Sequence, residues 1–340
     1  MADSNVSYLG AINSDVSTDS AARALFLKVF SGEVLGAFNE KNVMFGDGGA
    51  NGKHMVRTIN SGKTAQFVVT GKATANYHTN LGSALVGTRI NHAERNIHID
   101  AQLISQRFVS NFEEAMSHYE VRGEHAVQMG EALAVTGDRQ LLQVVILASR
   151  GTATVTGGDG GSKVSHADAD SDGDVLGALI FSAGERMDEK DVPDSDRYVA
   201  LRPSYYNLLV QSGKTIVDSA NTKQFSSDTQ LSYINKDIGG MGSIAMGRVE
   251  MINGMMILKS NNVPNTVVSE EDGTYNTYHG DFSNVIAACW QKQAVGTVKL
   301  IGLKTEADYL IEKQGTLMVA KYAMGHGILR PECAVEIATS

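Results

Sequence analysis

The sequence of 340 residues contains little proline, little cysteine and no long hydrophobic run. With four prolines, helices and strands can extend without interruption. Two cysteines, Cys289 and Cys333, are too few for a disulfide framework and match no zinc-site spacing, so we expect buried free thiols in a reducing cytosol. The strongest apolar stretch, Leu141 to Ser149, is far shorter than the ~20 residues of a membrane span. The start of the chain lacks the features of a signal peptide, so the sequence predicts a soluble cytosolic protein without membrane contact.

The composition and charge exclude further classes of protein. Hydrophobic residues make up 42% and charged residues 20% of the chain, which indicates a folded protein with a substantial core. The formal net charge of −9 argues against a protein whose main task is to grip a phosphate backbone, because that task needs a face rich in lysine and arginine.

The N-terminal part predicts an arm. Residues 1–20 are polar and rich in serine, and residues 21–42 have the pattern of an amphipathic helix with Leu35 and Phe38 on or near one face. The glycine-rich stretch from Gly46 to Lys53 then predicts a flexible joint.

A hairpin and a long loop follow the joint. Val56 to Ile59, a turn and then Phe67 to Val69 predict two strands that pair with each other. The next stretch, Thr70 to Glu94, has few core-forming residues, and apolar alternation resumes at Ile97. Ordering ~25 residues costs on the order of 25–50 kcal/mol of backbone entropy, which an isolated hairpin cannot offset. We therefore expect this segment to lie on a surface outside its own subunit.

The stretch from Ser110 to Arg150 predicts one long helix. Its first residue and Glu113 form a capping-box signature, and apolar residues recur at helical spacing along it. Gly123, Gly130 and Gly137 fall seven residues apart, so they form a stripe at which another backbone can approach closely. In the alternative interpretation, a glycine breaks this stretch into two or three shorter helices.

The remainder of the chain mixes helices and strands. Residues 175–191 have a helical pattern, residues 198–201 a strand pattern, and Pro203 favours the start of a short helix. Strands punctuated by Gly247 and Gly254 follow, and the chain after them is rich in strands to its end. Because the regular strand–helix alternation of a doubly wound enzyme is absent, we expect an α+β fold.

Two motifs suggest chemistry, and both have simpler interpretations. Asp168 to Gly173 matches the first half of a calcium loop, but Leu179 stands where the bidentate glutamate belongs. We favour an acidic, solvated loop that caps the following helix. His326 lies between two glycines ahead of Arg330 and Pro331, and we expect it to be packed in a structural corner between two strands rather than catalytic.

The sequence predicts no cofactor, metal or nucleotide site. The stretches that begin at Gly62 and Gly213 resemble half a phosphate loop, but each lacks the required first glycine. His118 and His125 lie seven residues apart on the expected long helix, where surface or interface positions are favoured over metal binding. No nucleophile–base pair can be nominated, so we expect a protein that is not an enzyme.

Several stretches resemble the major capsid proteins of short-tailed bacteriophages of the T7 type, which have the HK97-like capsid fold. The resemblance is carried by ALFLKVFSGEVLGAF, HMVRTINSGKTAQFVVTGKA, EEAMSHYEVRGE, AVGTVKL and KYAMGHGILRPE, in the same order as in that family and nearly end to end. In addition, DVPDSDRYVALRPSYYNLL and GMMILKSNNVP resemble the middle region of many tailed-phage capsid proteins.

The resemblance implies that the chain has five parts. They are an N-terminal arm and helix (1–44), an extended loop that lies over a neighbouring subunit (45–100), a peripheral domain with the spine helix (101–150), an axial domain (151–285) and return strands of the peripheral domain (286–340).

The resemblance also implies a structural function. Copies of the chain would form hexamers and pentamers of an icosahedral shell that encloses double-stranded phage DNA without binding it tightly. The implied partners are a scaffolding protein and a portal during assembly, with a decoration or cement protein as a further candidate. Assembly would take place in the host bacterial cytoplasm, and the product would be the capsid of the virion. Two alternatives stay open: a nanocompartment shell of the encapsulin type on the same fold, and a calcium-dependent enzyme built around the Asp168–Asp172 loop.

Charged residues of the extended loop are candidate assembly contacts. Our hypothesis is that basic residues of this loop meet acidic residues of the next subunit; the alternative is that they are simply solvated. The basic candidates are Arg57, Lys63, Lys72 and Arg89, and the acidic candidates are Glu113, Glu114 and Glu120. Some relatives form a covalent lysine–asparagine crosslink, but we predict none here.

Overall fold

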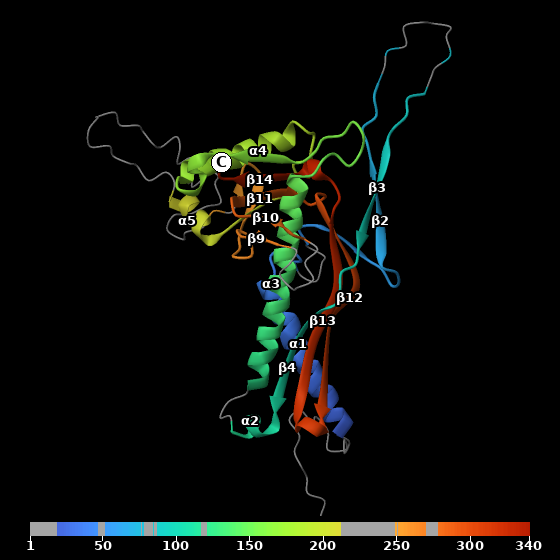
Figure 1. The fold of residues 1–340 in the computed structure, drawn as a ribbon, viewed down its shortest axis with the longest axis vertical. Coiled ribbons are helices and arrows are strands. Elements are labelled where there is room, and N and C mark those ends of the chain that lie inside the picture. Colours follow the sequence, from blue (N-terminus) through green and yellow to red (C-terminus); the bar gives the residue numbers. More distant parts are fainter. Residues whose placement is uncertain are drawn as a thin grey trace, which may run out of the picture. The chain divides into compact units, whose positions relative to one another are not determined.

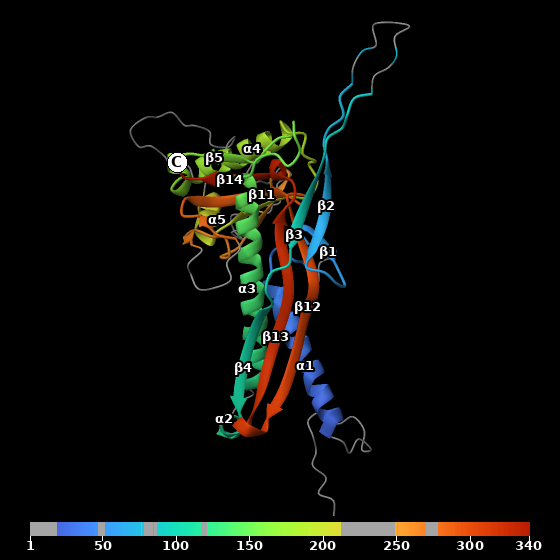
Figure 2. The ribbon, with the colours of Figure 1, turned by 45° about the vertical axis from the view of Figure 1, so that its right-hand side comes forward.

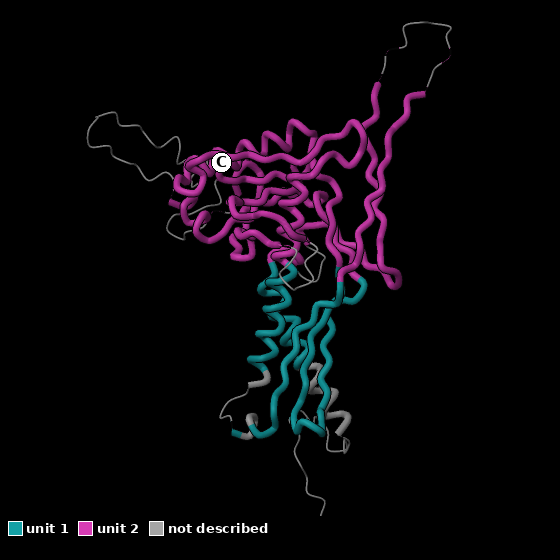
Figure 3. Tube along the Cα trace, in the orientation of Figure 1, with its two compact units in different colours: residues 1–42, 101–137, 300–324 teal, residues 43–100, 138–299, 325–340 magenta. Residues whose placement is uncertain are grey.

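The computed structural model describes two compact units (Figures 1 and 3). Unit 1 comprises residues 1–42, 101–137 and 300–324, and unit 2 comprises residues 43–100, 138–299 and 325–340. The residues that the structure describes are 19–46, 52–75, 77, 84, 87–116, 121–211, 249, 251–269 and 278–340. They form both helices and separate sheets, which confirms the α+β prediction.

Two helices of unit 1 pack closely because one of them carries a glycine at the contact. α1 (Asp19–Lys41) buries Val34 and Ala37 and packs against the first half of α3 (Val121–Ser149). An added Cβ at Gly130 of α3 would lie 2.5 Å from the carbonyl oxygen of Val34, so a larger residue would push the helices apart. The expected close approach at the glycine stripe is confirmed at this position.

The buried face of α1 differs from the expected one by one residue. Phe38 is buried and meets the ring of Tyr322 edge-on, with 6.3 Å between the ring centroids. Leu35, which we placed on or near this face, is 47% exposed. Successive helical residues lie ~100° apart, so the burial of Val34 turns its neighbour toward solvent.

The long helix predicted from Ser110 to Arg150 is two helices, so the continuous prediction is wrong. α2 (Asn111–Met116) begins after Ser110, whose Oγ accepts the N–H of Phe112 at 3.3 Å, and this cap is as expected. α3 then starts at Val121. Residues 117–120 lie outside the described residues, and all three glycines of the stripe lie within α3, so no glycine breaks the described part of this helix.

The predicted hairpin is also wrong, because its two strands belong to different sheets. β1 (Met55–Thr58) pairs in parallel with β12 (Val295–Leu310), while β2 (Thr64–Thr70) pairs antiparallel with β3 (His92–His98). The four-stranded sheet has the order β1-β12-β13-β4, with β13 (Gly315–Ile328) and β4 (Leu103–Ser110). Figure 2 shows α1 and α3 running alongside β4 and β13 in unit 1. There the hydroxyl of Tyr322 donates to the carbonyl oxygen of Leu133 at 3.4 Å.

A six-stranded sheet forms the core of unit 2. The predicted helix at 175–191, strand at 198–201 and helix start at Pro203 are confirmed, while Gly247 lies outside the described residues. Its order is β5-β14-β11-β6-β8-β7. The strands are β5 (Ser162–Ser165), β14 (Ala334–Ala338), β11 (Val285–Gln291), β6 (Arg197–Leu201), β8 (Met255–Lys259) and β7 (Met251–Ile252). Every residue of β11 is buried, including the free thiol of Cys289, and Cys333 is buried as expected. The helices are α4 (Gly173–Asp188) and α5 (Pro203–Gln211), and a small sheet pairs β9 (Val267–Val268) with β10 (Gly280–Asp281).

The predicted corner near the end of the chain exists, a few residues beyond His326. β13 continues through His326 to Ile328, and the 3-10 helix η3 (Pro331–Cys333) then leads into β14. His326 is 5% exposed, and its Nδ1 lies 2.9 Å from Oγ1 of Thr297, so the expectation that it is packed is confirmed. Among the described helices, none is long and apolar enough to span a membrane.

Candidate assembly surfaces

The β2–β3 ribbon has one face in the core and one face in solvent. Ala65, Val69 and Ile97 alternate along the ribbon and are at most 5% exposed. On the opposite face, Val68 is 73% exposed and stands across from Glu94, which is also exposed. An exposed valine between polar neighbours on a paired strand makes this face a candidate for contact with another molecule.

Arg57 holds the ribbon to the strand that precedes it. Its Nη1 donates to the carbonyl oxygen of Gln66 at 2.7 Å, and its guanidinium lies 5.8 Å from the ring centroid of Phe67. The bond connects β1 to the outer edge of β2. Arg57 therefore has an intrachain contact that its position in the sequence did not indicate.

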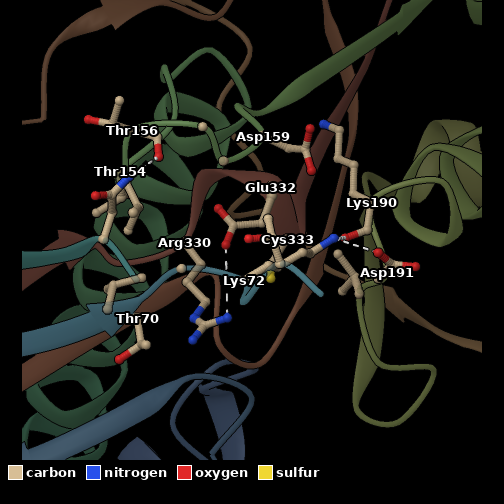
Figure 4. Close-up of a pocket in the computed structure, with 18 of the residues that line it drawn as sticks. Thr70, Lys72, Thr154, Thr156, Asp159, Lys190, Asp191, Arg330, Glu332 and Cys333 are labelled. Carbon is tan, nitrogen blue, oxygen red and sulfur yellow. Dashed lines mark hydrogen bonds and ion pairs between the residues drawn. The ribbon is translucent and has the colours of Figure 1, made fainter. Parts of the chain in front are cut away.

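A pocket of about 340 Å³, lined by both charged and apolar side chains, lies beside the base of the segment that joins β2 to β3 (Figure 4). Lys72 extends across it, and its Nζ lies 2.5 Å from Oδ2 of Asp191 and 3.3 Å from the carbonyl oxygen of Lys190. This ion pair raises the pKa of Lys72 and lowers that of Asp191. The walls come from residues 154–159, 190–193 and 330–333.

The structure leaves the other predicted contact residues unpaired or undescribed. Lys63 and Arg89 are exposed, with no side-chain partner among the described residues. Glu113 and Glu114 lie in α2, and Glu120 lies outside the described residues. The side chains of all three acidic candidates lie outside what the structure describes, so the basic–acidic contacts stay predictions.

The face of the unit 1 sheet that turns away from α1 and α3 carries apolar side chains that are partly exposed among the described residues. Along β13, Tyr322 and its alternate neighbours face α1 and α3, so the residues between them face the other way. Cross-strand pairs on that outer face join Leu317 to Phe108 and Lys321 to Ile104, which is 49% exposed. Sequence reasoning missed this surface because strand register decides which residues share a face.

Buried polar groups fix the joint between α1 and β1. Both oxygens of the buried Asp138 on α3 accept backbone N–H groups, from Val43 at 2.7 Å and from Met44 at 3.1 Å. Asn262 donates to the same carboxylate at 3.3 Å. Burial raises the pKa of Asp138 to about 6, although these donors favour the ionised form. These contacts hold the residues just before the joint that we expected to be flexible, and the central residues of the joint, 47–51, lie outside the described residues.

Two buried histidines lie in the same part of unit 2. Nδ1 of His54 is 3.1 Å from the carbonyl oxygen of Met44, and its Nε2 is buried without a hydrogen-bond partner. Burial lowers the pKa of His54 to about 4 and that of His326 to about 3. Both rings are therefore neutral at physiological pH and serve packing.

Acidification is expected to destabilise the subunit through these two histidines. An unfolded histidine has a pKa near 6.5, so the unfolded chain takes up protons before the folded chain does. The free energy of unfolding therefore falls as the pH drops below 6.5, by about 3 kcal/mol per histidine at pH 4. The raised pKa of Asp138 acts in the opposite direction below pH 6 and offsets part of this loss.

Denaturant titration of the dissociated subunit across this pH range measures the effect. His54→Asn places an amide where Nδ1 now bonds Met44 and removes one titrating ring. The free energy of unfolding should therefore fall less steeply as the pH drops. His279→Asn, at an exposed position, is the matched control and should leave it unchanged. An equally steep pH dependence in the His54 variant would contradict the assignment.

The acidic loop at residues 168–172 serves as a helix cap, as we favoured. Oδ1 of Asp172 accepts the N–H of Asp174 at 2.9 Å at the first turn of α4. Nδ1 of His166 accepts the N–H of Asp168 at 3.2 Å. Within the described part of the chain, no cluster of three or more histidine, cysteine or acidic residues has the arrangement of a metal site.

Comparison with known proteins identifies the family. Residues 66–338 match the family described as Gp10A-like major capsid proteins. The major capsid protein of Escherichia phage T7 is 32% identical over 336 residues, which cover 92% of this chain and 90% of that protein. The major capsid protein of Enterobacteria phage T3 is 31% identical over 341 residues, with the same two coverages. The solved capsid structure of the cyanophage P-SCSP1u is 39% identical with a TM-score of 0.72, and the match covers 85% of this chain and 86% of that chain. The chain therefore belongs to the Gp10A-like family of major capsid proteins, structural proteins of bacteriophage shells with the HK97-like fold.

Proposed function

We propose that copies of this chain assemble into hexamers and pentamers of a closed icosahedral head that encloses double-stranded phage DNA. The observation that carries the proposal is the family match across residues 66–338 together with the likeness to whole capsid proteins. A net charge of −9 suits a container that is filled with DNA without binding it tightly. Assembly takes place in the host cytoplasm with a scaffolding protein and a portal, and a decoration protein is a further partner.

The proposed parts of the subunit follow the HK97-like plan. We assign residues 1–44 to the arm, 45–100 to the extended loop, 101–150 to the peripheral domain with its spine helix, 151–285 to the axial domain and 286–340 to the return strands. The extended loop of one subunit lies over the next. This is supported by the exposure of the described residues from 72 to 91 and by the partly exposed apolar side chains on the outer face of the unit 1 sheet.

The alternatives are less well supported. A nanocompartment shell shares the fold, but the relatives that match over 92% of this chain are phage capsid proteins. A calcium-dependent enzyme would use the loop at residues 168–172, where Asp172 already caps α4.

Electron microscopy tests the proposal directly. The full chain is expressed alone and together with its scaffolding protein, and the products are imaged in negative stain. Shells, tubes or six-fold rings are expected, because subunits of this family bury their exposed surfaces against each other. A uniform population of monomers of 36.3 kDa under both conditions would overturn the proposal.

Charge reversal at Arg57 is expected to block capsomer formation while the subunit stays folded. The hypothesis places an acidic group of the next subunit within reach of this exposed guanidinium. Because Arg57 also bonds Gln66 in its own chain, Arg57→Met serves as the control: it removes the same intrachain bond without introducing a negative charge. Normal shells from Arg57→Glu, counted by electron microscopy, would contradict the hypothesis. Equal defects in both variants would assign the role of Arg57 to the bond with Gln66.

A further inference from the structure

We call residues 71–91, which join β2 to β3, the extended segment. Its first leg follows β2 and its second leg leads back to β3, and one side chain from each leg holds the segment at its base. The backbone N–H of Gly71 donates to the carbonyl oxygen of Asn91 at 2.9 Å, which closes the base. On the first leg, Lys72 pairs with Asp191. On the second leg, Nδ2 of Asn91 donates to the carbonyl oxygen of Thr156 at 3.1 Å. Each leg is therefore attached to a different loop of unit 2.

The two anchoring loops are themselves tied together. Nζ of Lys190 donates to the carbonyl oxygen of Gly160 at 2.6 Å and to Oγ of Ser162 at 2.5 Å. The N–H of Asp191 donates to the carbonyl oxygen of Asp188, the last residue of α4, at 2.9 Å. The anchors for Lys72 and Asn91 thus belong to one connected framework.

The backbone at Asp191 favours this arrangement. Asp191 has a φ of 60°, in the left-handed region that aspartate and asparagine tolerate better than most residues. A non-glycine residue in the left-handed region that also binds a specific partner, as Asp191 binds Lys72, supports a functional role for that residue.

Apolar packing does not orient the extended segment at its base. Every described residue from 72 to 91 is exposed, and the space beside the base is the pocket of about 340 Å³ shown in Figure 4. A segment with few buried contacts takes its direction from whatever polar contacts hold its ends.

We propose that Lys72, Asn91 and Asp191 are positioning residues that set the direction in which the extended segment leaves the subunit, and thereby the curvature of the shell. The inference rests on the proposed assembly function. The side chains of Lys72 and Asp191 are 67% and 77% exposed, so their pair adds little to the stability of the subunit. Variants at these positions are therefore expected to fold, and to change the direction of the extended segment rather than the stability of the subunit.

The direct test is a distance measurement in the dissociated subunit. Both native cysteines are buried, so spin labels attach selectively to cysteines introduced at Tyr77, which is 99% exposed, and at the exposed Asp170. The parent should give one narrow distance distribution, and Lys72→Met, Asn91→Asp and Asp191→Asn should broaden or shift it. Asp191→Asn keeps the backbone preference and removes only the charge. Unchanged distributions in these variants would overturn the proposal.

Asp159→Asn is the matched control. It removes one negative charge from the wall of the same pocket without breaking the Lys72–Asp191 pair, so it should leave the distribution unchanged. Lys72→Arg keeps the cation and should restore the narrow distribution. If the Asp159 variant broadens the distance distribution as much as the Asp191 variant does, the loss of any negative charge in the pocket, and not the loss of the ion pair, would be the cause. That result would also overturn the proposal.

Assembly gives the second readout. Without labels, Lys72→Met and Asp191→Asn should yield several-fold fewer shells of the parental diameter, with more tubes or irregular particles, while Asp159→Asn should match the parent. If Lys72→Met and Asp191→Asn both give shells of the parental diameter and yield, the link between these residues and shell curvature is refuted. If the parent itself forms no shells with its scaffolding protein, the proposed function fails, and the distance measurement still decides whether these residues orient the segment.

Discussion

Arg150→Met is expected to lower the free energy of unfolding of the subunit by about 3 kcal/mol or more. Nε and Nη2 of Arg150 bind the two carboxylate oxygens of Glu336 at 2.6 and 2.7 Å, and Nη1 donates to the carbonyl oxygen of Asp281 at 2.6 Å. Glu336 has no exposed area, so removing the guanidinium leaves a buried carboxylate without its partner, which typically costs ~3–5 kcal/mol. Denaturant titration of the dissociated subunit measures this loss.

The double variant Arg150→Met/Glu336→Leu distinguishes the contribution of the ion pair from that of the packing around it. With both charges removed, the buried carboxylate no longer needs a partner, and the double variant should regain most of the lost stability. If it is as unstable as Arg150→Met alone, the loss comes from packing against Phe282, whose ring centroid lies 5.6 Å from the guanidinium carbon, and the buried ion pair is not the cause.

Gly325→Ala is expected to destabilise the subunit by about 3 kcal/mol or to prevent its folding. A Cβ at this position of β13 would overlap with the carbonyl oxygen of His98, the last residue of β3, and would also meet the backbone of Ile99. Backbone atoms cannot move aside as a flexible side chain does, so the end of β13 must separate from the end of β3. The fraction of soluble, folded subunit and its denaturation midpoint report the effect.

Gly302→Ala is the matched control for this steric argument. Gly302 also lies within a strand, β12, but an added Cβ there would meet nothing within 4 Å. Alanine should be neutral or slightly stabilising there, because it restricts the unfolded chain. Equal losses in the two variants would show that strand propensity, rather than the contact with His98, governs the result.

These two sites show how the end of the chain is held in unit 2. Arg150 joins the end of α3 to β14, and Gly325 lets β13 pass close to the end of β3. Both contacts connect residues more than 180 positions apart in the sequence. A shell protein depends on such contacts, because each subunit must hold its shape while its exposed surfaces bind other copies.

Among the basic assembly candidates, the sequence did not indicate the intrachain partners that two of them have. Lys63 and Arg89 are exposed as a charged loop residue should be. The bond from Arg57 to Gln66 and the pair between Lys72 and Asp191 depend on backbone positions that only the folded chain defines. The second partner lies 119 residues away, beyond any local pattern.

The sequence by itself determined the elements whose signals are local. The helical patterns of α1, α4 and α5, the cap of α4, the proline that begins α5 and the strand pattern of β6 all lie within their own segments. These signals arise from side-chain spacing and backbone propensity over a few residues. The family resemblance, spread along the chain, also needed no coordinates.

Only the tertiary structure decided which strands pair and which faces are covered. β1 does not pair with its neighbour β2 but with β12, some 240 residues away. The stretch after Ser110 forms two helices, α2 and α3, although its apolar spacing is continuous. Such outcomes depend on burial against distant segments, whose free energy exceeds the small differences in local propensity. The contacts of Lys72 with Asp191 and of Asn91 with Thr156 are of the same kind, because each joins residues far apart in the sequence.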